Sequence, residues 1–340
     1  MVNSVAMVTP WKVRCGIFSY SEKLVQALAE LGIDVYIVRL PRFGAKTKEI
    51  LEGVITKIPM DKVDIIHIQH EYGLYQNLEG GFYGTLNAIA RHYNKPIITT
   101  MHAVGNWEVD KVISHVIVHN EFCARMFKRP SIIIPHGLHP TRTVDKGEAK
   151  KSYGLVPEAP TVGYLGFISN YKGLEQLITA MTGVKAGLII GGGWHVSAET
   201  EYMYNLKAAS LNMLPGKVKW LGWVPEEKLA TAYGAMDLIV YPSRFATESG
   251  SLLNAISHGK AVLASRIAPF IEKEKKGILI TFKNDVDLRR KIKKLLKNET
   301  LRKDLETKAW EYAEENSWEH VAELHSSLYD HAIKDLDTKK

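Results

Sequence analysis

The stretch that decides the fold is residues 237–265, DLIVYPSRFATESGSLLNAISHGKAVLAS. Two short apolar runs, 237–241 and 261–264, are typical of buried parallel strands. Between them, apolar residues recur at helical spacing from the small-residue turn 249–251 to Gly259, a residue type that favours the left-handed position just after a helix. The pattern predicts a strand, a helix and a second strand of an open parallel sheet.

The turn formed by Ser249, Gly250 and Ser251 is also a candidate anion site. The first N–H groups of a helix have no intrahelical partner, and the helix dipole places partial positive charge behind them. A phosphate group binds well at such a position. The same residues also fit an ordinary strand–helix corner with a serine cap, so both interpretations stay open for this turn alone.

Strands and helices alternate along the rest of the chain, which predicts an α/β fold with parallel sheets covered by helices on both faces. A polar segment with several prolines at 140–160 divides two such series. We therefore expect two Rossmann-like, doubly wound domains facing each other across a cleft, residues 1–142 and residues 143–317.

Composition narrows the class of protein. The chain has 340 residues and a formal net charge of +7, which suits an anionic ligand or a membrane surface. It lacks the basic stripe interleaved with aromatic residues that nucleic-acid binding favours. Cys15 and Cys123 are too few for a disulfide framework, and neither a signal peptide nor an apolar run of ~20 residues is visible. A cytoplasmic protein is expected.

Polar residues that follow predicted strands are candidates for chemistry, because ligands of open α/β sheets bind beyond the carboxyl ends of the strands. Lys172 lies where a strand turns into a helix, which the helix dipole disfavours unless an anion is bound; a solvated loop lysine is the alternative. His102 follows a strand, where a hydrogen bond to nearby backbone is the alternative to a catalytic role. Glu248 precedes a helix, where the helix dipole alone would favour its negative charge without a ligand. His67 and His70 point to opposite faces of a strand, so no metal site is expected.

Taken together, the motifs and their spacing resemble the retaining glycosyltransferases of family 4, which have the GT-B fold. The resemblance runs nearly end to end. Besides residues 237–265, it is carried by short motifs along the chain: Cys15-Gly16, IHIQHEYG at 66–73, TMH at 100–102, IPHG at 134–137, GFISNYKG at 166–173, the glycines 191–193 and LGWVP at 221–225. It implies that the second domain binds a nucleotide-sugar, that the first presents the acceptor, and that the last helix, 318–337, packs back on the first domain.

The resemblance also implies roles for single residues. Lys172 and the backbone N–H groups of the 249–251 turn would hold the donor diphosphate, and His102 would lie beside the transferred sugar. The full set comprises the catalytic candidates His102 and Glu248, the donor-binding candidates Gly16, Lys172, Gly191, Gly193, Trp223, Val224, Ser249, Gly250, Ser251 and Asn254, and the acceptor-side candidates His70, Glu71 and Tyr72.

The implied reaction moves a sugar from a nucleoside-diphosphate sugar to a hydroxyl of a carbohydrate or lipid-linked acceptor, with retention of anomeric configuration. It implies neither a metal ion nor a cofactor. No nucleic-acid partner is implied, and peripheral membrane contact stays open. One departure bears on activity: the family's paired glutamates align with Ala246 and Asn254, and Glu248 lies two positions after the first. The alternatives are therefore a weak or inactive nucleotide-sugar-binding relative that acts as partner of another transferase, and a GT-B phosphorylase that uses pyridoxal phosphate.

Overall fold

The computed structural model describes residues 2–13, 15–40, 47–75, 78–104, 115–127, 129–193 and 200–338. The chain divides into two compact units, Met1–Gly137 with Asn316–Lys340 (unit 1) and Leu138–Glu315 (unit 2). The boundaries expected from the sequence, after residues 142 and 317, lie close to these points. No helix in the described part of the chain is long and apolar enough to cross a membrane.

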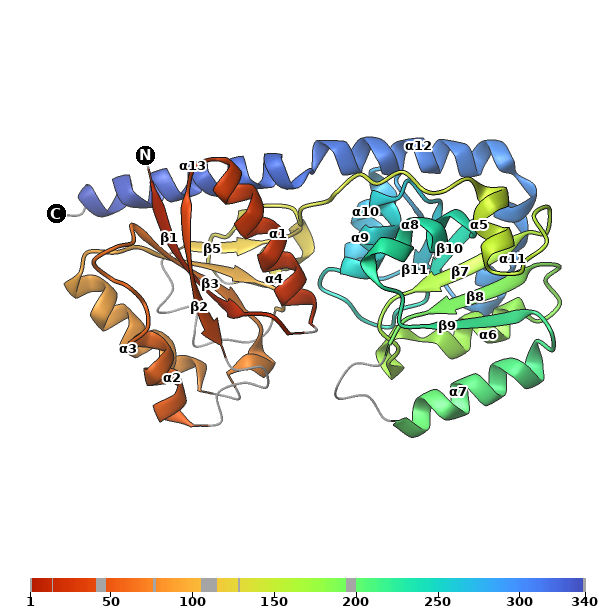
Figure 1. Cartoon of the computed structure of the whole chain (residues 1–340), viewed down its shortest axis with the longest axis horizontal. Helices are drawn as coiled ribbons and strands as arrows, with labels where there is room; N and C mark the ends of the chain where they lie inside the picture. The colour runs from red at the N-terminus through yellow and green to blue at the C-terminus, as the bar shows by residue number, and fades with distance from the viewer. Residues whose placement is uncertain are drawn as a thin grey trace. The chain divides into compact units, whose positions relative to one another are not determined.

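Unit 1 is built on a sheet whose described strands pair in parallel in the order β2-β1-β3-β4-β5-β6 (Figure 1). These strands are β1 (Ser4–Pro10), β2 (Asp34–Leu40), β3 (Ile65–His70), β4 (Ile97–Met101), β5 (His115–Val118) and β6 (Ile132–Ile133). Helices α1 (Gly16–Glu30) and α13 (Trp318–Asp337) cover one face, and α2 (Lys48–Ile55), α3 (Glu79–His92) and α4 (Glu121–Met126) cover the other. A short 3-10 turn, η1 (Tyr72–Leu74), follows β3.

The apolar runs of unit 1 form strands because both faces of the sheet are buried. In β1, Val5 and Met7 pack toward α1 and α13, whereas Ala6 and Val8 pack toward α2 and α3. Successive side chains of a strand point to opposite faces, so a strand covered on both sides needs a continuous apolar sequence. A buried hydrogen bond also joins α13 to the sheet: the Tyr329 hydroxyl lies 2.7 Å from Nδ1 of His67 in β3.

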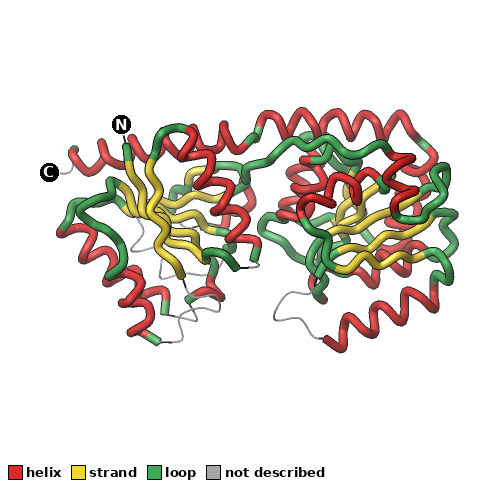
Figure 2. Tube along the Cα trace, in the orientation of Figure 1, coloured by secondary structure: helices red, strands yellow, loops and turns green. Residues whose placement is uncertain are grey.

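Unit 2 repeats the plan with the strand order β12-β11-β10-β7-β8-β9, again with parallel pairing between all described neighbours (Figure 2). The strands are β7 (Thr161–Leu165), β8 (Gly187–Gly191), β9 (Val218–Gly222), β10 (Leu238–Tyr241), β11 (Val262–Ser265) and β12 (Ile280–Phe282). The helices are α5 (Lys146–Ser152), α6 (Leu174–Met181), α7 (Thr200–Met213), α8 (Glu226–Gly234), α9 (Gly250–Ser257), α10 (Ala268–Lys275), α11 (Asp285–Lys297) and α12 (Glu299–Glu315). The predicted α/β fold of two doubly wound parallel sheets is confirmed.

The strand orders place a topological switch point in each unit. In unit 1 the direction of strand succession reverses between β1 and β3, and in unit 2 it reverses between β7 and β10. Loops that leave neighbouring strands at such a point diverge to opposite faces of the sheet and leave a crevice at its carboxyl edge, where ligands of open α/β sheets bind. The loops after β7 and β10 carry Lys172 and Ser249–Ser251, respectively.

Candidate active site

Three turns of unit 2 meet at Gly166, directly after β7. A Cβ atom on Gly166 would lie 2.9 Å from Cβ of Ser251, in the first turn of α9. A Cβ atom on Gly192, after β8, would lie only 1.8 Å from the carbonyl oxygen of Gly166, and φ of Gly192 is +146°. Such a close approach of two backbones accommodates glycine alone. The ends of β7 and β8 and the start of α9 therefore form one compact edge.

The first turn of α9 is capped and anchored to the strand that precedes it. The Ser249 hydroxyl accepts a hydrogen bond from the Leu252 N–H at 3.4 Å. The Tyr241 hydroxyl, at the end of β10, lies 2.5 Å from the carbonyl oxygen of Ser251. By their position, the N–H groups of Gly250 and Ser251 have no intrahelical acceptor. The positive end of α9 is thus held in place with donors for an anion.

Lys172 lies in a 3-10 turn, η3 (Asn170–Lys172), and α6 begins two residues later at Leu174. Lys172 is only 8% exposed, so it is not the solvated loop lysine of the alternative interpretation. The amine lies 4.8 Å from the centre of the Tyr171 ring, and no ion pair or hydrogen bond joins it to the described residues. Burial lowers the pKa of Lys172 to about 8. A buried cation without an anionic partner is costly, and a bound phosphate would remove that cost.

Glu248 directly precedes the Ser249 cap, but its carboxylate is already bonded. Lys273 of α10 donates to both oxygens, at 2.9 and 2.7 Å, and the Ser249 N–H donates at 2.9 Å. Both side chains of the ion pair are less than a tenth exposed. Burial, the largest single effect, would lower the pKa of Lys273, but the charges of Glu248, Tyr312 and Glu272 together outweigh it, and the pKa is raised. Glu248 therefore braces the turn that opens α9, and any contact of its carboxylate with a ligand would be shared with Lys273.

The remaining donor-side candidates of unit 2 lie near the same edge of its sheet. A Cβ atom on Gly191 would lie 3.0 Å from the Val224 side chain, and one on Gly193 would lie 3.2 Å from the Trp223 ring. Trp223 is half exposed, as a residue that stacks on a base would need to be. Asn254, one turn into α9, has an exposed side chain. The sequence analysis did not identify Lys273, because it lies in a charged segment in which no pattern distinguishes one lysine from the others.

In unit 1, His102 follows β4 and joins a cluster of aromatic and histidine rings. Its Nε2 lies 2.8 Å from Oε1 of Gln69, and its ring packs edge-on against Tyr20 at 4.8 Å. Nδ1 of His102 lies 3.4 Å from Nε2 of His119, a residue that follows β5 and that the sequence analysis missed. Burial, reinforced by His119 and His136, lowers the pKa of His102 well below its usual range. His102 is therefore a neutral ring at neutral pH.

The acceptor-side candidates lie at the end of β3 and directly after it, at the switch point of unit 1. His70 is fully buried, and its Nδ1 lies 3.1 Å from the Tyr83 hydroxyl. Its Nε2 has no hydrogen-bond partner among the described residues, and burial lowers its pKa to about 3. The Tyr72 ring packs edge-on against His70 at 4.7 Å, and Glu71 between them in sequence is partly exposed. Gly16 opens α1, where an added Cβ atom would meet no atom within 4 Å.

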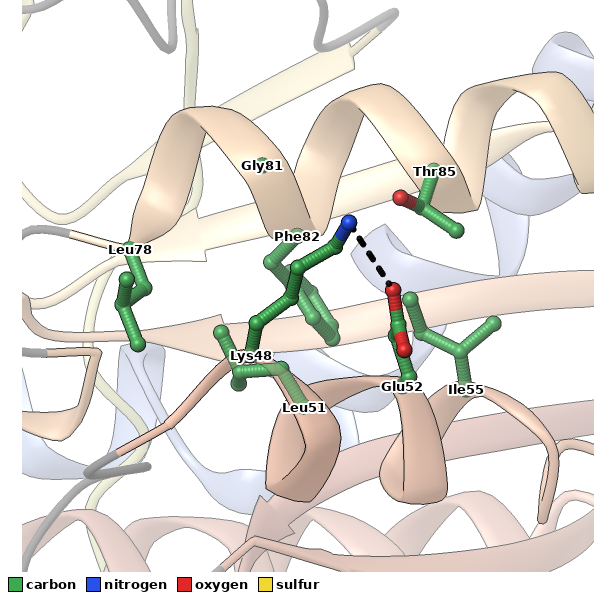
Figure 3. Close-up of a pocket in the computed structure, with 8 residues that line it drawn as sticks. All are labelled: Lys48, Leu51, Glu52, Ile55, Leu78, Gly81, Phe82 and Thr85. Atoms are coloured by element: carbon green, nitrogen blue, oxygen red, sulfur yellow. Dashed lines mark ion pairs between the residues drawn. The ribbon is translucent and has the colours of Figure 1, made fainter.

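A separate cavity of about 160 Å³ lies between α2 and α3 (Figure 3). Its floor is apolar, and across its rim Lys48 forms a 3.4 Å ion pair with Glu52 of the same helix. None of the predicted catalytic or binding residues lines it. The lining residues are Lys48, Leu51, Glu52, Ile55, Leu78, Gly81, Phe82 and Thr85.

Comparisons with known proteins agree with this geometry. Residues 145–312 match the family model for glycosyl transferases group 1. An uncharacterized glycosyltransferase of Methanocaldococcus jannaschii is 24% identical over 323 residues, 90% of this chain and 77% of the relative. The sucrose-phosphate synthase of Thermosynechococcus elongatus has a TM-score of 0.80 at 19% identity and covers 98% of this chain and 100% of its own. Anabaena HepE, solved with UDP and glucose, has a TM-score of 0.76 at 15% identity over 97% of this chain and 100% of its own.

Fold, switch-point loops and relatives together define the class of protein as a glycosyltransferase with the GT-B fold. The match to the family model of glycosyl transferases group 1, over residues 145–312, lies within unit 2.

Proposed function

We propose that this glycosyltransferase moves a sugar from a nucleoside-diphosphate sugar to an acceptor hydroxyl with retention of anomeric configuration, as the family 4 enzymes do. Lys172 carries the proposal: its buried amine has no ion-pair partner among the residues that the structure describes, and it lies on the loop after β7, next to the strand whose loop opens α9. A lysine and a helix N-terminus are both common phosphate ligands in proteins. The UDP and glucose bound by the similar Anabaena structure support this donor class.

The residues then divide the chemistry as follows. A nucleoside diphosphate gains negative charge as the glycosidic bond opens, and Lys172 with the first turn of α9 stabilises that charge. Glu248, held by Lys273, keeps this turn in place. Trp223 and Val224 border the base, and the acceptor hydroxyl enters on the face that the diphosphate leaves. His70, Glu71 and Tyr72 border the acceptor.

Replacing His102 with alanine tests its assigned contact with the transferred sugar. We expect turnover to fall by about 100-fold, since a donor or acceptor aimed at the reacting group contributes at least this much. Nucleoside-diphosphate affinity should stay within twofold, because all the proposed nucleotide ligands except Gly16 belong to unit 2. Steady-state release of the diphosphate and titration calorimetry give the two numbers, with the exposed His320→Ala on α13 as control. Equal losses of both, or unchanged turnover, would leave His102 as a structural member of its ring cluster.

Transfer is expected to be independent of divalent metal ions, because Lys172 and the α9 dipole supply the positive charge that a cation would otherwise provide. An excess of chelator should change the initial rate by less than twofold. A rate abolished by chelator and restored by magnesium or manganese ions would contradict this assignment of the charge.

A second candidate function is a nucleotide-sugar-binding relative without turnover, acting as partner of another transferase. The Glu248–Lys273 ion pair favours it, because both carboxylate oxygens are engaged, and Ala246 and Asn254 supply no other carboxylate there. Diphosphate release from a panel of donor sugars separates the two functions. A protein that only binds the nucleotide-sugar would be stabilised by the nucleotide but would release no diphosphate above the uncatalysed rate.

A further inference from the structure

Arg244, a residue outside the predicted site, joins the two loops that flank the switch point of unit 2. Its backbone N–H donates to the carbonyl oxygen of Tyr171 at 2.8 Å. Its Nη1 donates to the carbonyl oxygen of Asn170 at 2.6 Å and also contacts Oδ1 of that residue. Its Nη2 pairs with the carboxylate of Glu175, in the first turn of α6. The acceptors of Arg244 thus lie within three residues of Lys172 on both sides in the sequence.

The turn that carries Lys172 rests directly on the loop that carries Arg244. Gly173 has a φ of +66°, and a Cβ atom there would lie 2.3 Å from the carbonyl oxygen of Pro242. Within the turn, the Lys172 N–H donates to the Ser169 carbonyl oxygen and the Gly173 N–H to that of Asn170, both at 3.0 Å. The direction of the Lys172 side chain therefore depends on how this turn sits on the loop.

The surroundings of Arg244 do not favour a separate anion-binding site at its guanidinium. The guanidinium borders a shallow cavity of about 230 Å³ that is also lined by the carboxylates of Glu175 and Asp285, which repel a phosphate. Its two terminal nitrogens already donate to the turn and to α6. Arg244 can therefore influence a phosphate through the lysine turn, without touching it.

We propose that Arg244 is a positioning residue that locks the Lys172 turn onto the loop after β10 and so directs the lysine amine at the donor diphosphate. The inference rests on the proposed function to the extent that Lys172 binds the diphosphate. A planar guanidinium can reach two acceptors in fixed directions at once, which an ammonium on a flexible stem cannot. Arg244→Lys should therefore recover little of what Arg244→Met loses.

A double-mutant cycle with Lys172 tests how Arg244 acts. We expect Arg244→Met alone to weaken nucleoside-diphosphate binding about 10-fold and to leave binding of the nucleoside unchanged, by calorimetry. In the Lys172→Met background the same change should cost less than about twofold. Arg266→Met is a matched control, because Arg266 follows the neighbouring strand β11, is similarly half exposed and pairs with Glu274. It should leave affinity unchanged.

Amide hydrogen exchange provides a readout that needs no nucleotide. The N–H groups of Lys172 and Gly173 should exchange faster in Arg244→Met than in wild type or Arg266→Met. Losses that multiply in the double mutant would mean that Arg244 contacts the phosphate itself, and unchanged affinity with unchanged exchange would make it a surface ion pair; either result overturns the proposal. If the wild-type protein bound no diphosphate, the proposed function would fail, while faster exchange in Arg244→Met would still support the positioning role.

Discussion

Lys172→Met is expected to weaken nucleoside-diphosphate binding by about 1.5–3 kcal/mol, roughly 10- to 150-fold in Kd, the usual contribution of a hydrogen bond to a charged group. Methionine keeps an apolar stem of similar length and removes the charge. The free energy of unfolding of the ligand-free protein should stay the same or rise, because a buried amine without an anionic partner opposes folding. Titration calorimetry and denaturant unfolding measure the two effects.

Two controls separate the charge of Lys172 from charge in general. Lys185→Met removes the same charge from an exposed site just before β8, at the opposite edge of the sheet, and should leave affinity within twofold. In wild type, diphosphate affinity should fall as pH rises through about 8, where the Lys172 amine loses its proton, and this step should vanish in Lys172→Met. A destabilised Lys172→Met with unchanged affinity would show that the lysine is structural.

Gly192→Ala should be the most damaging single change at the carboxyl edge of unit 2. The new Cβ atom would lie 1.8 Å from the carbonyl oxygen of Gly166, in a backbone conformation of φ +146° that side chains rarely adopt. Overpacking and backbone strain together are expected to cost about 2–6 kcal/mol of folding stability. Because the collision displaces the backbone beside Ser251, diphosphate affinity should fall at least 10-fold where the variant is still folded.

Gly183→Ala is the matched control for Gly192→Ala. Gly183 also has a positive φ, +75°, but an added Cβ atom would meet nothing within 4 Å. It should cost only the conformational term of about 1–2 kcal/mol and leave binding intact. Equal stability losses in the two variants, measured by denaturant unfolding, would show that the turns around Gly166 are not closely packed.

The fold could be predicted because it depends on local patterns. The apolar runs 237–241 and 261–264 predicted strands, and the structure contains β10 and β11 there, with α9 between them as expected. Parallel strands that are buried on both faces need apolar side chains on both, so they appear in the sequence as continuous apolar runs. The sequence analysis did not single out helices α2 and α10, which have eight residues each.

The details of the candidate site could be predicted only in part. Lys172 and His102 could be identified because each follows a predicted strand, and ligands bind beyond the carboxyl ends of the strands. This rule needs only the order of elements along the chain. It also applies to His119 after β5, which was missed. Lys273 and Arg244 could not be found in this way: Lys273 bonds a carboxylate 25 residues away and Arg244 one that is 69 residues away. Such partners are set by how helices pack on the sheet, which no local spacing records.

Thermal unfolding with a panel of uridine, guanosine, adenosine and thymidine diphosphates, each beside its own nucleoside, tests the central claim most directly. We expect at least one diphosphate, at about 100 times its Kd, to add ~2.7 kcal/mol of stability. Its nucleoside should add much less, and the difference should disappear in Lys172→Met. If no diphosphate stabilised the protein, or if a nucleoside stabilised it as much as its diphosphate, the loops after β7 and β10 would not be a donor phosphate site.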